Sequence, residues 1–370
     1  MVNIKAVAIL IVAVLIGSAA GYAMLSNGED NGIPGGKDND LPNGEGDKDG
    51  YPSSVTITQN DGKKVEVPTP VERICLVNGN AAEFMQVLGV TDRVVGVSDS
   101  IKGNPEYGYI YKDVETIGKF SAPSGEKILE LDSTVVIGQC TSMPIKDPAA
   151  LEALGITVIL LDCYGINQQS DDLKQLASLF GTEAIDRAEK YIEIYDRTIG
   201  SVTDAAFAED ITCYMELSNG KAYTSKAEMN DLIELAGGYN IVTELLQNPT
   251  SSTQLLSNEA LITYDDGKGP NFIFIRDKNI KDETSAEELY QTLMCRDGWS
   301  ELEATKNDNI YIVTQSGILS GPRIYIGLVY LAELFHPGEL NMSAADLLKE
   351  YNETFGFEIS STMGYHHVSS

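Results

Sequence analysis

Cysteine is scarce and scattered in this 370-residue chain, which excludes several kinds of site. The cysteines form no CxxC pair and lack the spacing of a zinc module. We expect small buried thiols, with a Cys140 to Cys163 bridge as an alternative if the protein is exported. No cysteine precedes Cys75, so we expect no lipid-modified cysteine near the N-terminus. The set is Cys75, Cys140, Cys163, Cys213 and Cys295.

Histidine and positive charge are also in short supply. The chain has three histidines, and only His336 precedes the last few residues, too few for a cage that holds bare zinc or manganese. Asp and Glu outnumber Lys and Arg by 55 to 26, a net charge of −29, which argues against a nucleic-acid partner. Neither a GxSxG elbow nor a Gly-Lys-Ser/Thr loop occurs. We therefore expect no enzyme, with an extracellular hydrolase or metal-cluster enzyme as the weaker alternative.

The N-terminal region reads as an export segment followed by a tether. An apolar run over 6–16 lies behind Lys5 and leads into small residues, so 1–25 is predicted to be a cleaved signal or a retained membrane anchor. Residues 26–53 are rich in Gly, Asn and Asp and predict a flexible linker. We expect an exported protein, tethered to the outer face of the cytoplasmic membrane.

The rest of the chain predicts an α/β fold with two lobes. Alternating residues around Asn60-Asp61-Gly62 predict a hairpin, and short apolar strands then alternate with helical segments, as in a parallel sheet flanked by helices. Apolar residues at three- and four-residue steps over 183–206 predict one long helix. We expect an N-terminal lobe at 54–182, a bridging helix at 183–207 and a C-terminal lobe at 208–370.

Five ordered segments carry a resemblance to a known family. They are VTITQNDGKKVEVPTPVERI, AAEFMQVLGVTDRVVGVSD, AGGYNI, LLSNEALITYDDGKGPNFIFI and WSELEATKNDNIYIVTQ leading into GPRIYIGLVYLAELFHP. The chain resembles the class III periplasmic binding proteins of ABC importers for iron-siderophores, haem and cobalamin. The resemblance implies two α/β lobes bridged by a rigid helix, with a ligand cleft between them.

The resemblance also implies partners. Family members dock on a permease, driven by its ATPase, through one glutamate on each lobe, which by motif would be Glu126 and Glu259. Glu83, in another of the motifs, is expected to be structural. We expect a monomer with no cofactor of its own, whose ligand is a ferric chelate, haem or corrinoid. A surface sensor or scavenger of the same fold is the alternative.

Candidate cleft residues follow the strands, because ligands of open α/β sheets gather beyond the carboxyl ends. The period-two tyrosines of EYGYIYKD suit a large chelate, or equally a half-buried strand. Arg323 offers a rigid fork of donors, with a structural role as its alternative. Trp299, the one tryptophan, lies outside the expected cleft, so cobalamin is not favoured over siderophore or haem. The predicted ligand-binding residues are Asn78, Asn80, Asp99, Tyr107, Tyr109, Gln139, Tyr164, Tyr223 and Arg323.

Overall fold

The computed structural model describes residues 51–141, 143–207, 211–314, 317–360 and the strand at 365–367. These residues belong to one compact unit, Glu45–Ser370. The predicted export segment at 1–25 and all but the end of the predicted linker lie outside the described residues. Within the described ranges, no helix is both long enough and apolar enough to cross a membrane.

A hairpin precedes the first sheet. β1 (Ser54–Thr58) and β2 (Lys64–Pro68) pair antiparallel around the Asn60-Asp61-Gly62 turn, where Gly62 has a φ of +82° that favours glycine. The hairpin is the one that the sequence predicts. Its tip contacts the next sheet, because the backbone N–H of Asn60 donates to the carbonyl of Leu160 (3.2 Å).

The first sheet has five parallel strands in the order β5-β4-β3-β8-β9, which confirms the predicted parallel arrangement. Its central strands are buried along their length, so they read as continuous apolar runs. A separate small hairpin joins β6 (Gly118–Lys119) to β7 (Ala122–Pro123). The sheet strands are β3 (Ile74–Leu76), β4 (Val94–Val97), β5 (Glu115–Thr116), β8 (Val135–Gly138) and β9 (Thr157–Leu160). The helices of this lobe are α2 (Gly79–Leu88), α3 (Asp99–Lys102), α4 (Gly125–Glu130), α5 (Pro148–Glu152) and α6 (Gln169–Ala177), with 3-10 turns at Thr91–Arg93 and Gly108–Tyr111.

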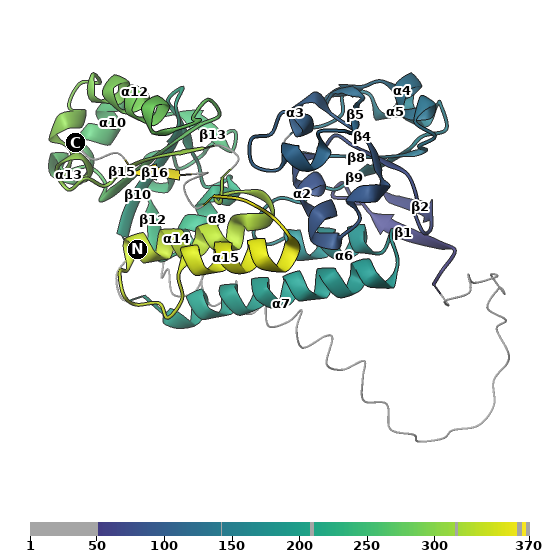
Figure 1. Ribbon diagram of the computed structural model, residues 1–370. Helices are drawn as coiled ribbons and strands as arrows, with labels where there is room; N and C mark the ends of the chain where they lie inside the picture. The colour runs from purple at the N-terminus through teal and green to yellow at the C-terminus, as the bar shows by residue number, and fades with distance from the viewer. Residues whose placement is uncertain (1–50, 142, 208–210, 315–316, 361–364, 368–370) are drawn as a thin grey trace, which may run out of the picture. The chain divides into compact units, whose positions relative to one another are not determined.

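The long predicted helix is α7 (Thr182–Ala205), a single element of 24 residues. Its buried side chains recur at three- and four-residue steps, from Ala184 through Tyr191 to Val202, so one face is apolar along the whole length. This face packs against α2 and α6 of the first lobe and against α14 (Ile324–Phe335) (Figure 1). The helix therefore links the two halves of the chain through buried contacts.

The second sheet is mixed, with the path β13-β11-β10-β14-β15-β16 and β12 also paired to β10. Its centre is parallel, while β11, β13 and β16 pair antiparallel at its margins. The strands are β10 (Ile211–Leu217), β11 (Lys221–Tyr223), β12 (Gly238–Asn240), β13 (Thr253–Leu255), β14 (Phe272–Asp277), β15 (Ile310–Thr314) and β16 (Tyr365–His367). The helices are α8 (Glu228–Leu235), α9 (Val242–Leu245), α10 (Asn258–Ile262), α11 (Tyr264–Gly267), α12 (Glu283–Met294) and α13 (Glu303–Lys306), with a 3-10 turn at Trp299–Glu301.

The last helices connect the lobes again. A 3-10 turn at Gly321–Arg323 leads into α14, which contacts α7 and α8, and α15 (Ala344–Phe355) contacts α14 and α2. One buried apolar cluster therefore includes residues of both sheets, such as Leu76 of β3 and Phe274 of β14, together with the buried face of α7. The two lobes share this core.

Candidate functional site

Three of the predicted ligand residues meet where strands of the first sheet end. Asn78 caps α2, because its Oδ1 atom accepts from the backbone N–H groups of Asn80 (2.9 Å) and Ala81 (3.4 Å). Its Nδ2 atom donates to the carbonyl of Leu161 (2.6 Å), and the side chain of Gln139 donates to its Oδ1 atom (3.2 Å). Asn78 and Gln139 are buried and hold the strand ends together. Contact with a ligand stays a prediction for Asn78, Asn80 and Gln139.

The loop after β9 is held by Asp162, which the sequence did not single out. Its carboxylate accepts from the backbone N–H groups of Cys140 (2.7 Å) and Thr141 (3.0 Å) and from the Thr141 hydroxyl (2.8 Å). These bonds join the loops that follow β8 and β9.

The tip of the N-terminal hairpin reinforces the same loop. Asn60 accepts from the backbone N–H of Asp162 (2.5 Å) and donates to the carboxylate of Asp172 (2.9 Å), which also accepts from the backbone N–H of Cys163 (2.8 Å). Burial raises the pKa of Asp172, and the hydrogen bond from Asn60 opposes the shift. The carboxylates of Asp162 and Asp172 therefore both fix the position of the loop at 162–167.

A tyrosine and an arginine of the second lobe lie near this loop. Tyr223, at the end of β11, accepts a hydrogen bond from Arg276 of β14 (3.0 Å), and the guanidinium carbon lies 5.6 Å from the centre of the Tyr223 ring. Burial raises the pKa of Tyr164, while the neighbouring Arg276 guanidinium opposes the shift. The structure thus brings the predicted Tyr164 and Tyr223 together around Arg276, which the prediction missed. Lys226, three residues after Tyr223, is exposed.

A cavity of about 730 Å³ opens beside this loop. Its size falls within the usual range for a site that takes one small molecule. The lining combines the hairpin tip, the loops after β8 and β9, one face of α6 and a single residue of α8, Glu228. The lining residues are Thr58, Gln59, Asn60, Gly62, Thr141, Asp162, Tyr164, Gln168, Asp171, Lys174, Gln175 and Glu228.

Glu228 is the least compensated carboxylate of the cavity. Its Oε2 atom is buried and has no hydrogen-bond partner among the described residues. Burial and the nearby carboxylates of Asp162, Asp231 and Asp172 raise its pKa to about 7. The position of Glu228 at the start of a helix did not indicate this role, because a glutamate there ordinarily interacts favourably with the helix dipole. A charge that changes near neutral pH therefore lines the cavity.

Replacing Glu228 with glutamine is expected to stabilise the fold at high pH. A raised carboxyl pKa contributes stability that is present below the ordinary value of 4.5 and is lost as pH rises through about 7. Because the carboxyl group is partly exposed, solvent screening reduces the effect, and we expect a gain of about 1–2 kcal/mol near pH 8 and almost none near pH 4. Urea unfolding at both pH values measures the difference. The exposed Glu189→Gln is the control, and a pH-independent gain in Glu228→Gln would contradict the assignment.

The tyrosines of EYGYIYKD form a 3-10 turn, not the half-buried strand considered as their alternative. Tyr107 is buried and its hydroxyl donates to the carbonyl of Gly79 (3.0 Å), as Tyr111 does to that of Ala82 (2.5 Å). Tyr109 is exposed, and its hydroxyl accepts from the backbone N–H of Glu358 (3.1 Å). Asp99 is exposed at the start of α3. Tyr107 therefore anchors α2, and ligand contact stays a prediction for Tyr107, Tyr109 and Asp99.

Arg323 requires a correction. Its guanidinium is buried between two carboxylates: Nε lies 2.8 Å from Glu83, and Nη2 pairs with Glu106. The Tyr351 hydroxyl also donates to Glu83 (2.8 Å). Burial raises the pKa of Glu83, although Arg323 opposes the shift. Because Arg323 is only 1% exposed, we reassign it from ligand binding to structure, and Glu83 has the structural place expected for it.

The two glutamates predicted to dock on a permease occupy equivalent positions. Glu126 and Glu259 are each the second residue of a short helix, α4 or α10, after a serine cap whose hydroxyl accepts from a backbone N–H of the first turn. Both are exposed, and neither is in an ion pair with any described residue. Their side chains are thus available to a partner, and the docking role stays a prediction.

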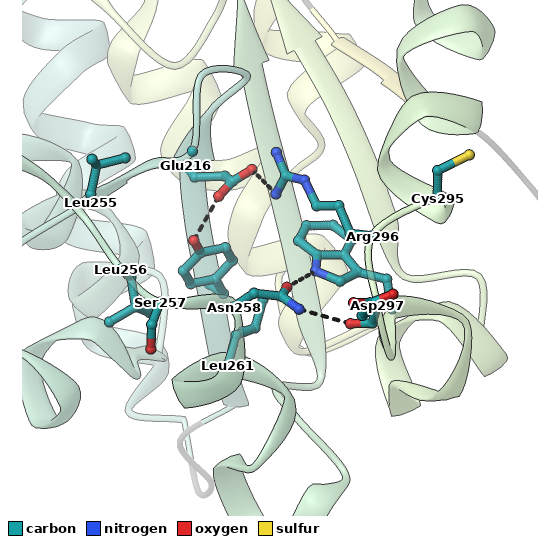
Figure 2. Close-up of a pocket in the computed structure, with 12 residues that line it drawn as sticks. Glu216, Leu255, Leu256, Ser257, Asn258, Leu261, Cys295, Arg296 and Asp297 are labelled. Atoms are coloured by element: carbon teal, nitrogen blue, oxygen red, sulfur yellow. Dashed lines mark hydrogen bonds and ion pairs between the residues drawn. The ribbon is translucent and has the colours of Figure 1, made fainter.

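A second cavity of about 420 Å³ lies beside α10. Glu216 is paired with Arg296 (Figure 2), with Oε1 2.6 Å from Nη1. Asn258 accepts a hydrogen bond from the Trp299 indole (2.7 Å). The Tyr214 hydroxyl donates to Glu216 (2.7 Å), so the polar groups satisfy one another. Trp299 is buried here and does not line the first cavity.

The described residues form neither a metal site nor a disulfide. No group of three His, Cys, Asp or Glu side chains in the described ranges is placed to hold a metal ion. All five cysteines are free thiols, so the alternative Cys140 to Cys163 bridge is not formed. Burial raises the pKa of Cys163 well above its usual value. The arrangement offers hydrogen bonds, aromatic rings and charge to a ligand.

Comparison with known proteins agrees with this geometry. A family model described as periplasmic binding protein matches residues 74–316. The chain is 24% identical over 297 residues to the uncharacterized ABC transporter substrate-binding lipoprotein YvrC of Bacillus subtilis, covering 76% of this chain and 86% of that one. It is 27% identical over 221 residues to a cobalamin-binding protein of Halobacterium salinarum, covering 57% of each chain.

The fold has solved counterparts. The structure of the TroA-like periplasmic binding protein FepB of Veillonella parvula aligns with a TM-score of 0.66 at 18% identity, covering 85% of this chain and all of that one. The match includes both lobes, in agreement with the predicted architecture. The family match covers most of the folded part of the chain. A periplasmic family agrees with the exported location that the sequence predicts. The chain belongs to the periplasmic binding protein family, whose members bind solutes outside the cytoplasm.

Proposed function

We propose that this protein is the receptor of an ABC importer and captures a metal chelate, an iron-siderophore, haem or a corrinoid, without converting it. The cavity at the carboxyl ends of the first sheet carries the proposal, because it combines a suitable volume with residues of both lobes. Tyr164 from one lobe and Tyr223 and Arg276 from the other supply aromatic and polar contacts for a large ligand.

Two further features support the receptor role. The exposed Glu126 and Glu259 present one carboxylate on each lobe, as docking on a permease requires. The relatives include a substrate-binding lipoprotein of an ABC transporter and a cobalamin-binding protein. We further propose that the segment at 1–25 tethers the receptor to the outer face of the membrane and that it acts as a monomer.

Ligand binding is expected to raise the melting temperature of the purified full chain in mild detergent. A ligand at about 100 times its Kd stabilises the folded state by about 2.7 kcal/mol, which corresponds to a shift of several degrees. The panel contains ferric hydroxamates, haem and cobalamin, with the metal-free hydroxamates as controls. Mass spectrometry of the recovered ligand checks that it is unchanged. Absence of a shift with every chelate, or conversion of the ligand, would overturn the proposal.

A further inference from the structure

We propose that Glu228 restricts the cleft to metal chelates of neutral or positive net charge. The inference rests on the proposed function, and it adds the charge class of the ligand. It concerns one side chain of the second lobe that reaches the cavity of the first. Four observations carry it: the approach of Glu228 to the first lobe, its lack of a partner, the carboxylates around it and the shortage of cations in the lining.

Glu228 is packed against a glycine. A methyl group added at Gly165 would lie 2.5 Å from the carboxyl carbon of Glu228, so only glycine allows the approach. Gly165 also has a φ of +87°, which favours glycine. The carboxyl group is therefore held at the loop after β9, close to Tyr164 and Asp162, where a ligand at the strand ends would lie.

The surroundings of this carboxyl group are acidic. Asp162 accepts hydrogen bonds from the backbone N–H groups of Cys140 and Thr141, and Asp172 accepts one from that of Cys163, while burial raises the pKa of Asp172. Asp231 lies one turn further along α8. The titratable and charged groups around Glu228 are Asp162 and Tyr164 after β9, Asp171, Asp172 and Lys174 of α6, Tyr195 of α7, and Asp231 of α8.

Little positive charge offsets these carboxylates. Lys174 is the one cationic side chain among the described residues that line the cavity, and it lies 3.9 Å from the carboxylate of Asp171. Arg276 bonds to Tyr223 and lies beside Tyr164, outside that lining. The cavity therefore carries a net negative charge whenever Glu228 is ionised.

This negative charge acts strongly on a bound ligand, because the ligand displaces water from the cavity. Interactions between charges strengthen as solvent is excluded, and a like charge opposite a buried one disfavours binding. An anionic chelate would therefore meet repulsion from Glu228, while a cationic group would replace the missing partner of its Oε2 atom. At a pH where Glu228 is protonated, this preference should weaken.

Three pairs of related chelates that differ in net charge test the proposal. They are ferrioxamine B, which has a free ammonium group, with neutral ferrioxamine E; cyanocobalamin with its monocarboxylic acid; and the dimethyl ester of haem with haem. Affinities of the full chain in detergent are measured for wild type, Glu228→Gln and the exposed control Glu189→Gln, near pH 8 and near pH 6. Near pH 8 the wild type should prefer the more positive member of each bound pair by roughly tenfold.

The outcomes separate the two proposals. We expect Glu228→Gln to reduce the preference to about twofold or less, wild type near pH 6 to show a reduced preference, and Glu189→Gln to keep it. If no member of any pair binds wild type, the proposed function fails and the inference falls with it. If a pair binds but Glu228→Gln keeps the preference, or Glu189→Gln loses it equally, the assignment to Glu228 is overturned while the receptor role stands.

Discussion

Replacing Arg323 with methionine is expected to destabilise the fold by about 3–5 kcal/mol. The change keeps much of the side-chain volume but leaves Glu83 and Glu106 buried without their cation. Breaking one partner of a buried ion pair is more costly than removing the whole pair, because a lone charge or an unpaired polar group remains in the core. Urea unfolding of the full chain in detergent measures the loss.

Two further variants show whether the loss of stability comes from the carboxylates of Glu83 and Glu106 that no longer have a cation beside them. Arg197→Met breaks an exposed pair with Glu350 (2.6 Å) and is expected to cost less than about 1 kcal/mol. Adding Glu83→Gln and Glu106→Gln to Arg323→Met should recover part of the stability, since both carboxylates are then neutral. A loss in Arg323→Met no larger than in Arg197→Met would contradict the structural assignment.

Reversing the charge of both Glu126 and Glu259 is expected to reduce uptake of the labelled chelate at least tenfold while leaving ligand affinity within twofold. Arginine at these exposed helix starts would face the cations expected on a permease, and like charges across an interface are costly. Both positions lie outside the cavity lining, so binding should persist. Cellular uptake and direct binding of the same chelate are measured together.

The matched control reverses two other exposed glutamates, Glu130 at the end of α4 and Glu288 in α12. It changes the net charge of the chain by the same amount. Retained uptake in Glu126→Arg with Glu259→Arg, or equal loss in the control pair, would remove the docking role from these residues.

Local sequence patterns predicted the elements that local forces determine. The three- and four-residue periodicity of 183–206 predicted α7 within a residue at each end, because burial of one helix face requires that spacing. Asn60-Asp61-Gly62 predicted the hairpin, since its turn needs a residue with positive φ. The apolar strands predicted the parallel sheet, which is covered on both faces.

The tyrosine segment shows where a local pattern was insufficient. Period-two spacing fits a strand, but the side chain of Asn104 accepts from the backbone N–H groups of Glu106 (2.8 Å) and Tyr107 (3.2 Å) and starts a turn. Turn chemistry thus outweighed the alternation, and the rings of Tyr107 and Tyr111 are buried against α2.

The candidate site was only partly predictable, because its decisive contacts join distant segments. The strand-end rule found Asn78, Gln139 and Tyr164. It missed Arg276, although that residue ends an apolar strand, and it missed Glu228, whose importance depends on Gly165 in the other lobe. Arg323 was misassigned for the same reason, since its partners lie 240 and 217 residues away in the chain.

The core shared by the two sheets and α7 also affects how the protein unfolds. Leu76 and Phe274 belong to one continuous buried cluster. Exposing either sheet to water would therefore also expose apolar side chains of α7 and α14 that pack in this cluster. We therefore expect the two lobes to unfold together. An isolated lobe would lack part of its interior, and loss of either lobe would be loss of the whole receptor.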